Sequence, residues 1–220
     1  AKVHIHVNKP ADVFKICSNF GAVKGEKADD MFKQQKIVQK HKTTNIAIVT
    51  DSGADIPGDI DLDIHVVPVR YNFGDIGYID KLSQTPEEFY NELTNNPIHP
   101  QTSQPTPGDF RRQYQYLKSH YDSIISIHIP QQMSGTYQSA MSASKRVDNT
   151  KITVIDGLSA SVGLGLIVME MAKLAKDGKS KEEIEKVLFK IISSTNVFII
   201  VKDLSYAVKG GRLPQWVKKI

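Results

Sequence analysis

The chain has 220 residues, of which 40% are hydrophobic and 24% are charged, as in a globular protein with a substantial core. Cys17 is the only cysteine, so an intrachain disulfide is excluded, and we expect a buried, inert thiol. The net charge of +4 comes from residues 1–45, which carry nine Lys and four acidic residues. Aromatic residues do not interleave with a basic stripe, which argues against binding to nucleic acid.

The N-terminal part, residues 1–34, is predicted to form a small unit of strand, helix and strand. KVHIHV alternates apolar and polar residues over 2–7, a helix is expected over 11–21, and a short strand over 22–28. His4 and His6 could share one strand face, but with no third recognisable ligand the sequence predicts no metal site. Residues 35–45 are polar and lysine-rich without apolar periodicity, which indicates a linker.

From residue 46 onward, strand and helix patterns alternate. Strands are predicted at 45–50, 123–129, 151–155 and 196–201, and a β excursion at 65–80. Helices are predicted to begin at the capping residues Thr85 and Thr106, and further helices over 134–147, 161–178 and 181–194. This alternation predicts an α/β fold with a mainly parallel sheet and helices on both faces. The apolar run Leu158 to Met169 is too short to span a bilayer and predicts a buried helix.

The loops that follow the predicted strands are rich in Ser, Thr and Gly and poor in ionisable groups. Ligands bind at this edge of open α/β sheets, and hydroxyls with helix N-terminal amides suit an anion. Ser134, Gly135 and Thr136 are therefore candidates to bind a carboxylate or a phosphate. The alternative is that Ser134 or Thr136 only caps its helix, with nothing bound.

Enzyme motifs are missing from the same loops. The segment MSGTY differs from the G-x-S-x-G pattern of hydrolases, and no histidine with an evident carboxylate partner is placed to activate Ser134. His128 lies in an apolar strand, where a structural role is the usual one. Gly163 and Gly165 lack the third glycine of a dinucleotide-binding loop. We therefore expect neither catalytic residues nor a cofactor.

Five motifs in order resemble those of the DegV family over about residues 45–220. They are TDSGADIP (50–57), TSQPTPGDF (102–110), SGTYQSA (134–140), VIDGLSASVGLG (154–165) and YAVKGGRLP (206–214). The resemblance implies a two-lobed, cytoplasmic lipid carrier with no membrane span, and a second lobe beginning near residue 220. Part of the lipid pocket is then expected to lie beyond this chain.

The same resemblance implies a long-chain fatty acid as ligand. Such carriers present the carboxylate to a fatty-acid kinase, which makes an acyl phosphate for phospholipid synthesis. By position, Thr102 and Ser134 match the hydroxyls that bind the carboxylate, with Ser103, Gly135 and Thr136 as neighbours. Arg212 matches a basic residue near the head-group entrance.

Residues 1–34 resemble the closing segment of the dihydroxyacetone-kinase-related subunit of fatty-acid kinase. The resemblance implies a full-length chain that joins a kinase module to the carrier. Residues 35–45 would be the linker, and residues 46–220 would be the carrier domain. An alternative function is a small-ketose or phosphate-binding enzyme subunit related to dihydroxyacetone kinase. Those enzymes hold the ketose through a histidine, and no histidine here lies in a matching motif.

Overall fold

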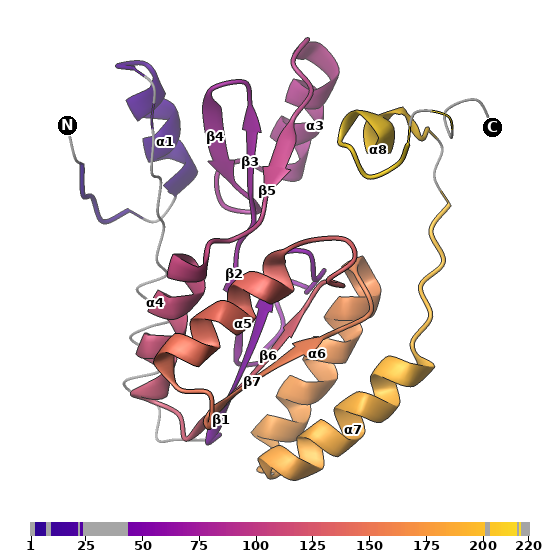
Figure 1. Cartoon of the computed structure of the whole chain (residues 1–220). Coiled ribbons are helices and arrows are strands. Elements are labelled where there is room, and N and C mark those ends of the chain that lie inside the picture. Colours follow the sequence, from indigo (N-terminus) through magenta and orange to yellow (C-terminus); the bar gives the residue numbers. More distant parts are fainter. Residues whose placement is uncertain are drawn as a thin grey trace. The chain divides into compact units, whose positions relative to one another are not determined.

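The computed structural model describes residues 3–7, 10–21, 23, 44–200, 203–214 and 216, with the helices and strands shown in Figure 1. The chain divides into two compact units built from separate stretches of sequence. The parallel unit takes its described residues from 31–67 and 104–202. The antiparallel unit takes its described residues from 1–30, 68–103 and 203–220.

A four-stranded parallel sheet forms the centre of the parallel unit. Its strands, in the order β2-β1-β6-β7, are Ile64–Val67, Ile46–Asp51, Ser123–His128 and Ile152–Asp156. Every neighbouring pair runs parallel. All six residues of β1 are buried, as expected for an apolar strand covered on both faces. The predicted parallel sheet and its strands at 45–50, 123–129 and 151–155 are confirmed.

Helices cover both faces of this sheet, as predicted (Figure 1). They are α4 (Pro107–Lys118), α5 (Thr136–Val147), α6 (Ser161–Lys176) and α7 (Lys181–Ser194). Successive residues of a strand point to opposite faces. Ile46 and Ile48 therefore pack in a cluster with α6 and α7, while Ala47 and Val49 pack with α4 and α5.

The antiparallel unit contains a three-stranded sheet in the order β4-β3-β5. Its strands are β3 (Arg70–Phe73), β4 (Ile76–Ile79) and β5 (Gln101–Ser103), and its helices are α1 (Pro10–Ser18), α3 (Pro86–Asn95) and α8 (Ser205–Lys209). Tyr71 stacks on Tyr78 at 5.1 Å and meets Phe89 edge-on at 5.3 Å. These aromatic contacts join the sheet to α3. The β excursion predicted at 65–80 is confirmed, whereas β5 was not predicted.

Two predicted strands are wrong over the described residues. Residues 3–7 and 196–200 have no strand pairing. Phe198 and Ile200 are 92% and 99% exposed, so the described part of the chain offers them no sheet to join. The strand predicted at 22–28 and the linker at 35–45 lie, apart from residues 23, 44 and 45, outside the described residues.

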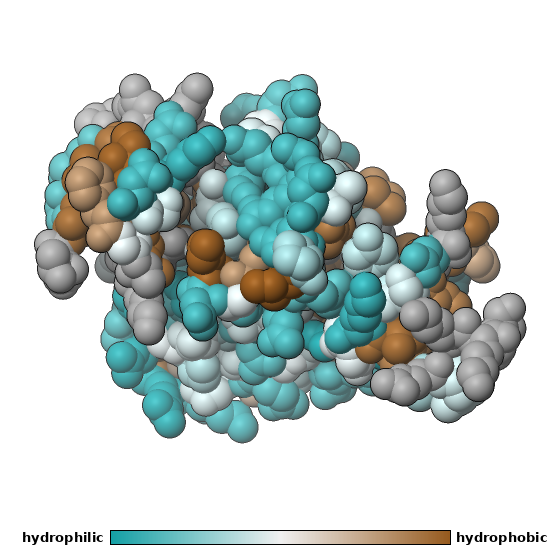
Figure 2. All heavy atoms as spheres, turned by 90° about the horizontal axis from the view of Figure 1, so that it is seen from above, coloured by the Kyte–Doolittle hydropathy of each residue, from teal (hydrophilic) through white to brown (hydrophobic). Residues whose placement is uncertain are grey.

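The surface carries both polar and apolar residues, as the composition of the chain predicts. Figure 2 shows a face on which hydrophilic residues predominate and apolar residues are interspersed. Cys17 is half-buried rather than buried, and the neighbouring Ile16 on the nine-residue helix α1 is exposed. Across the described residues, every helix is too short or too polar to cross a membrane.

Candidate ligand site

Three neighbouring strands of the parallel sheet end in polar residues that lie side by side. β1 ends at Asp51, β6 at His128 and β7 at Asp156. Val49 pairs with Ser126, and the same register aligns Asp51 with His128, which itself pairs with Asp156. This row lies at the carboxyl edge of the sheet, where open α/β folds bind their ligands.

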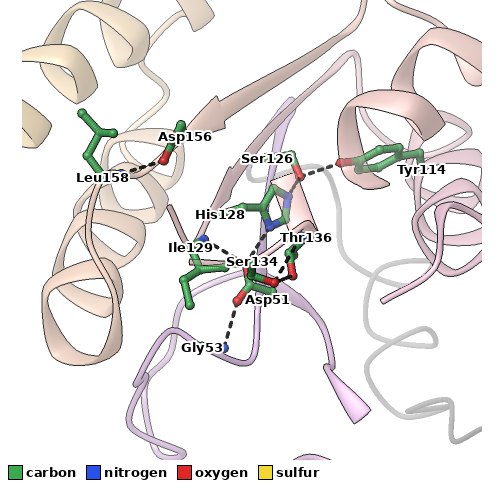
Figure 3. A network of polar contacts seen from close by, with 10 residues as sticks. All are labelled: Asp51, Gly53, Tyr114, Ser126, His128, Ile129, Ser134, Thr136, Asp156 and Leu158. Atoms are coloured by element: carbon green, nitrogen blue, oxygen red, sulfur yellow. Dashed lines mark hydrogen bonds and ion pairs between the residues drawn. The ribbon is translucent and has the colours of Figure 1, made fainter. Parts of the chain in front are cut away.

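A buried hydrogen-bonded chain begins at this row (Figure 3). His128 Nδ1 lies 2.9 Å from Asp51 Oδ2, and His128 Nε2 lies 2.7 Å from Ser126 Oγ. Tyr114, on α4, donates its hydroxyl to Ser126 Oγ at 2.8 Å. All four side chains are fully buried. Sequence analysis found no carboxylate partner for His128, and Asp51 corrects that expectation.

The donor and the acceptor of each hydrogen bond in this buried network follow from the chemistry of the four side chains. Burial raises the pKa of Tyr114, so its phenol remains a hydrogen-bond donor. Ser126 accepts this bond and can donate its own proton to His128 Nε2. His128 then carries its proton on Nδ1 and donates to Asp51, so a neutral imidazole satisfies every partner.

The same network of buried hydrogen bonds argues against a serine hydrolase. Both ring nitrogens of His128 are engaged, so neither remains to act as the base for Ser134. Ser126 lies beside His128, but it is fully buried and out of reach of a substrate. Among the described residues, no three His, Cys, Asp or Glu side chains are grouped to hold a metal ion.

The predicted hydroxyl pair lies at the start of α5. Ser134 Oγ lies 2.8 Å from Thr136 Oγ1 and accepts from the Thr136 backbone N–H at 3.3 Å. Thr136 is fully buried, whereas Ser134 is half-buried. Gly135 is the N-cap residue, and no side chain caps the helix. The N-cap residue Gly135 therefore supplies no side-chain cap, Ser134 engages only the Thr136 amide of the first turn, and the remaining first amides of α5 suit an anion.

Gln104 restricts the space beside this pair, a role that sequence analysis missed. A Cβ atom at Gly135 would lie 2.2 Å from Gln104 Oε1, far inside van der Waals contact. Gln104 Nε2 also donates to Ser139 Oγ on α5 at 3.3 Å. The TSQP motif thus contacts the start of α5 through its glutamine. Gly135 permits this close approach because it has no side chain.

The remaining predicted residues belong to the antiparallel unit. Thr102 and Ser103 lie on β5, opposite Tyr71 and Arg70 of β3, and both side chains are exposed. Arg212 Nη2 lies 3.5 Å from Thr102 Oγ1, while its Nη1 donates to the Gly210 carbonyl at 2.8 Å. Within its own unit, each predicted group is therefore brought together: Thr102 with Arg212, and Ser134 with Thr136.

Comparison with known proteins gives a consistent assignment. A family model described as "Uncharacterised protein, DegV family" matches residues 45–220. Protein DegV of Bacillus subtilis is 34% identical over 172 residues, which cover 77% of this chain and 61% of the relative. A DegV domain-containing protein of Caldanaerobacter subterraneus is 38% identical over 170 residues, which cover 76% of this chain and 60% of the relative. The chain thus spans about three fifths of the length of the curated relatives it matches.

Solved structures with the same fold include several described as binding lipid. DegV of Bacillus subtilis, described as a fatty acid binding protein, superposes with a TM-score of 0.73 at 34% identity over 77% of this chain and 61% of that one. A DegV family protein of Thermus thermophilus, described by its fatty acid binding, superposes with a TM-score of 0.72 at 34% identity. The match covers 76% of this chain and 60% of that one. The fatty acid kinase B3 protein of Streptococcus pneumoniae, loaded with linoleic acid, superposes with a TM-score of 0.71 at 23% identity. The match covers 80% of this chain and 64% of that one and shows the shared fold.

Proposed function

The chain belongs to the DegV family, and we propose that it binds a long-chain fatty acid by the carboxylate and presents it to a fatty-acid kinase. The kinase, on a separate protein or on the same full-length chain, would form the acyl phosphate, and this chain would perform no chemistry. Two relatives at 34% identity are described as fatty-acid-binding proteins. On this chain, the observation that carries the proposal is the uncapped start of α5 beside Ser134 and Thr136.

Ser134 is the proposed donor to the carboxylate in the parallel unit. Its oxygen accepts from the Thr136 N–H, and it can also accept from the Thr136 hydroxyl. With both of those bonds made, the Ser134 proton is directed to a ligand. The α5 dipole favours the negative charge of the carboxylate at this helix start.

Thr102, Ser103 and Arg212 are the proposed contributors from the antiparallel unit. Thr102 supplies a second hydroxyl donor, with Ser103 beside it, and the Arg212 guanidinium adds a permanent positive charge near the head group. Presentation requires a carboxylate that a kinase can reach, and the exposure of Thr102 and Arg212 supports this requirement. The acyl tail would contribute most of the affinity, at about 0.8 kcal/mol per buried CH₂.

An enzyme subunit that holds a ketose through histidine is less well supported. His128 lies six residues before Ser134, and both of its nitrogens are already bonded in the core. It could attack a carbonyl only after leaving Asp51 and Ser126. Asp51 and Ser126 would then each lose one buried hydrogen bond.

Lipid extraction tests the proposal directly. Full-length protein produced in bacteria should yield a long-chain fatty acid by mass spectrometry, and the delipidated full-length protein should bind palmitate in a titration. Absence of both lipid and binding would contradict the proposal and favour an adaptor with an empty cleft. ATP turnover by the pure chain would contradict the expectation that it performs no chemistry.

A further inference from the structure

We propose that Asp51 and Asp156 are positioning residues that fasten the loop after β6 from its two sides and thereby orient Ser134 and Thr136. The two carboxylates end the strands that flank β6 in the sheet. The loop that begins at Ile129 leads directly to α5. The part of the proposal that concerns the ligand rests on the proposed function, whereas the fastening of the loop can be tested without any ligand.

Asp51 holds the first residue of the loop. Its Oδ2 accepts from the backbone N–H of Ile129 at 3.1 Å and from His128 Nδ1 at 2.9 Å (Figure 3). Its Oδ1 accepts from the backbone N–H of Gly53 at 2.9 Å. One carboxylate therefore ties the turn after β1 to the end of β6. The buried Tyr114–Ser126–His128 chain holds that carboxylate in place.

Asp156 holds the loop from the other side. Its Oδ2 accepts from the backbone N–H of Gln131 at 3.2 Å, and its Oδ1 accepts from the backbone N–H of Leu158 at 3.0 Å. Leu158 has a φ of +46°, a conformation that non-glycine residues rarely adopt. The carboxylate thus stabilises an unusual turn after β7 while it restrains the second fastened residue of the loop.

The loop between the two fastenings and α5 is short and internally bonded. The backbone N–H groups of Met133 and Ser134 both donate to the Pro130 carbonyl, at 2.9 and 3.1 Å. Pro130 lies between Ile129 and Gln131, the residues that the two aspartates hold. A movement of either fastened residue would therefore pass through this turn to the Ser134 hydroxyl. Orientation of that kind affects recognition of a carboxylate more than burial of an acyl tail.

A purely structural role for the two aspartates predicts a different result. Loss of stability alone would weaken binding of any long-chain ligand equally. Loss of orientation should weaken binding of palmitate while leaving hexadecanol, which has the same chain and a neutral head group, unchanged. The affinity ratio of palmitate to hexadecanol therefore separates the two roles.

Asp156→Ala is the primary variant, because Asp156 is only half-buried and its loss should not prevent folding. Asp148→Ala is the matched control. Asp148 also accepts two backbone N–H groups, from Thr150 at 3.1 Å and Lys151 at 3.3 Å, but it follows α5 at the helix's opposite end. Asp51→Asn is the second variant, since an amide has one acceptor oxygen and cannot serve all three N–H donors that Asp51 satisfies.

Amide hydrogen exchange of the ligand-free chain decides whether the loop is fastened. Exchange at Gln131 and Ser134 should accelerate about tenfold in Asp156→Ala, and exchange at Ile129 and Ser134 should do so in Asp51→Asn, the effect of one lost charge-assisted bond. All three amides should exchange at the wild-type rate in Asp148→Ala. Unchanged exchange at these three amides in folded Asp156→Ala and Asp51→Asn would overturn the proposal, whether or not the chain binds lipid.

Titration with the two lipids decides whether the fastening orients the head-group site. The palmitate-to-hexadecanol ratio should fall about tenfold in Asp156→Ala relative to wild type and to Asp148→Ala. An unchanged ratio in a variant with faster exchange would overturn the orienting role. If wild-type protein binds neither lipid, the proposed function fails, while the exchange result still decides the fastening.

Discussion

Helices α4 and α7 of the parallel unit begin with complete capping boxes, whereas α5 and α6 of the same unit begin with no side-chain cap. At Thr106 and Ser180, the side-chain hydroxyl accepts a hydrogen bond from the backbone N–H of the third helical residue. The carboxylate of that residue, Asp109 or Glu183, accepts one from the backbone N–H of the N-cap residue. At Gly135 and Ala160 no such exchange exists. The uncapped pair are the helices that directly follow strands β6 and β7 of the parallel sheet.

The difference shows that stability and ligand binding make opposite demands on a helix start. A capping box uses the first amides of a helix for the fold itself and contributes about 0.5–2 kcal/mol. An uncapped start leaves those amides for another acceptor. Two serines, Ser180 at a capped start and Ser134 at an uncapped one, therefore allow the comparison to be tested by the same chemical change.

The largest effect is expected for Ser134→Ala. A hydrogen bond to a charged group contributes about 1.5–3 kcal/mol, so palmitate affinity should fall about ten- to a hundredfold, more than the loss of the Ser134–Thr136 bonds alone would produce. Calorimetric titration and thermal melts of the same sample measure the affinity and the melting temperature. A lowered melting temperature with unchanged affinity would mean that Ser134 only supports the helix.

Ser180→Ala should give the reverse pattern. The Ser180 hydroxyl accepts from the Glu183 N–H at 3.2 Å, and its removal should lower the free energy of unfolding by about 1 kcal/mol. Palmitate affinity should match that of the wild type. Urea denaturation measures the first quantity, and a loss of affinity in this variant would remove the distinction between the two helix starts.

A smaller effect is expected for Gly135→Ala, which inserts a methyl group against the Gln104 side chain. The exposed glutamine can turn away at a cost of about 0.5 kcal/mol, losing its bond to Ser139. Gln104→Ala removes the obstacle, so the double variant should be no less stable than Gln104→Ala alone. If the stability losses of the two single variants add in the double variant, contact between the new methyl group and Gln104 is not the cause of the destabilisation.

The smallest effect concerns pH at the capped start of α7. The backbone N–H of Ser180, followed by Lys179, lowers the pKa of Glu183 from its ordinary value of 4.5. Because the folded pKa is the lower one, the stabilisation is present above pH 4.5 and is lost as the pH falls through the folded pKa. Unfolding of Glu183→Gln should therefore depend less on pH below 4.5 than unfolding of the wild type. Parallel curves for the two proteins would contradict this assignment.

Local patterns made much of the fold predictable. The apolar runs at β1, β6 and β7 and the capping boxes at Thr85 and Thr106 act within a few residues, so the sequence displays them directly. The three-residue strand β5 could not be predicted in the same way, since QTS becomes a strand only by pairing with β3. The apolar alternation at 2–7 failed for the converse reason: residues 3–7 have no strand partner in the described part of the chain.

The candidate site was predictable to a similar degree. Ser134 and Thr136 lie in one short motif, and the structure brings their hydroxyls together. Asp51 and His128 are 77 residues apart, and their contact depends on how β1 aligns with β6. A hint was present, because both strands are six residues long and both end in a polar residue. The role of Gln104 depends on the packing of its side chain against α5, which no local pattern reveals.

The pairing of Asp51 with His128 also bears on how the chain rejects misfolded alternatives. Ile46 and Ile48 enter one apolar cluster and Ala47 and Val49 the other, so a β1 strand shifted by one residue would still bury apolar side chains on both faces. Burial of apolar surface alone therefore discriminates less sharply between the correct and the shifted sheet than it would for a strand with one polar face. The shift would, however, separate Asp51 from His128 and Ile129 and leave the buried carboxylate with only its local bond from the Gly53 N–H, at a cost of several kcal/mol. The polar ends of these strands thus help to select one native sheet from near-degenerate competitors.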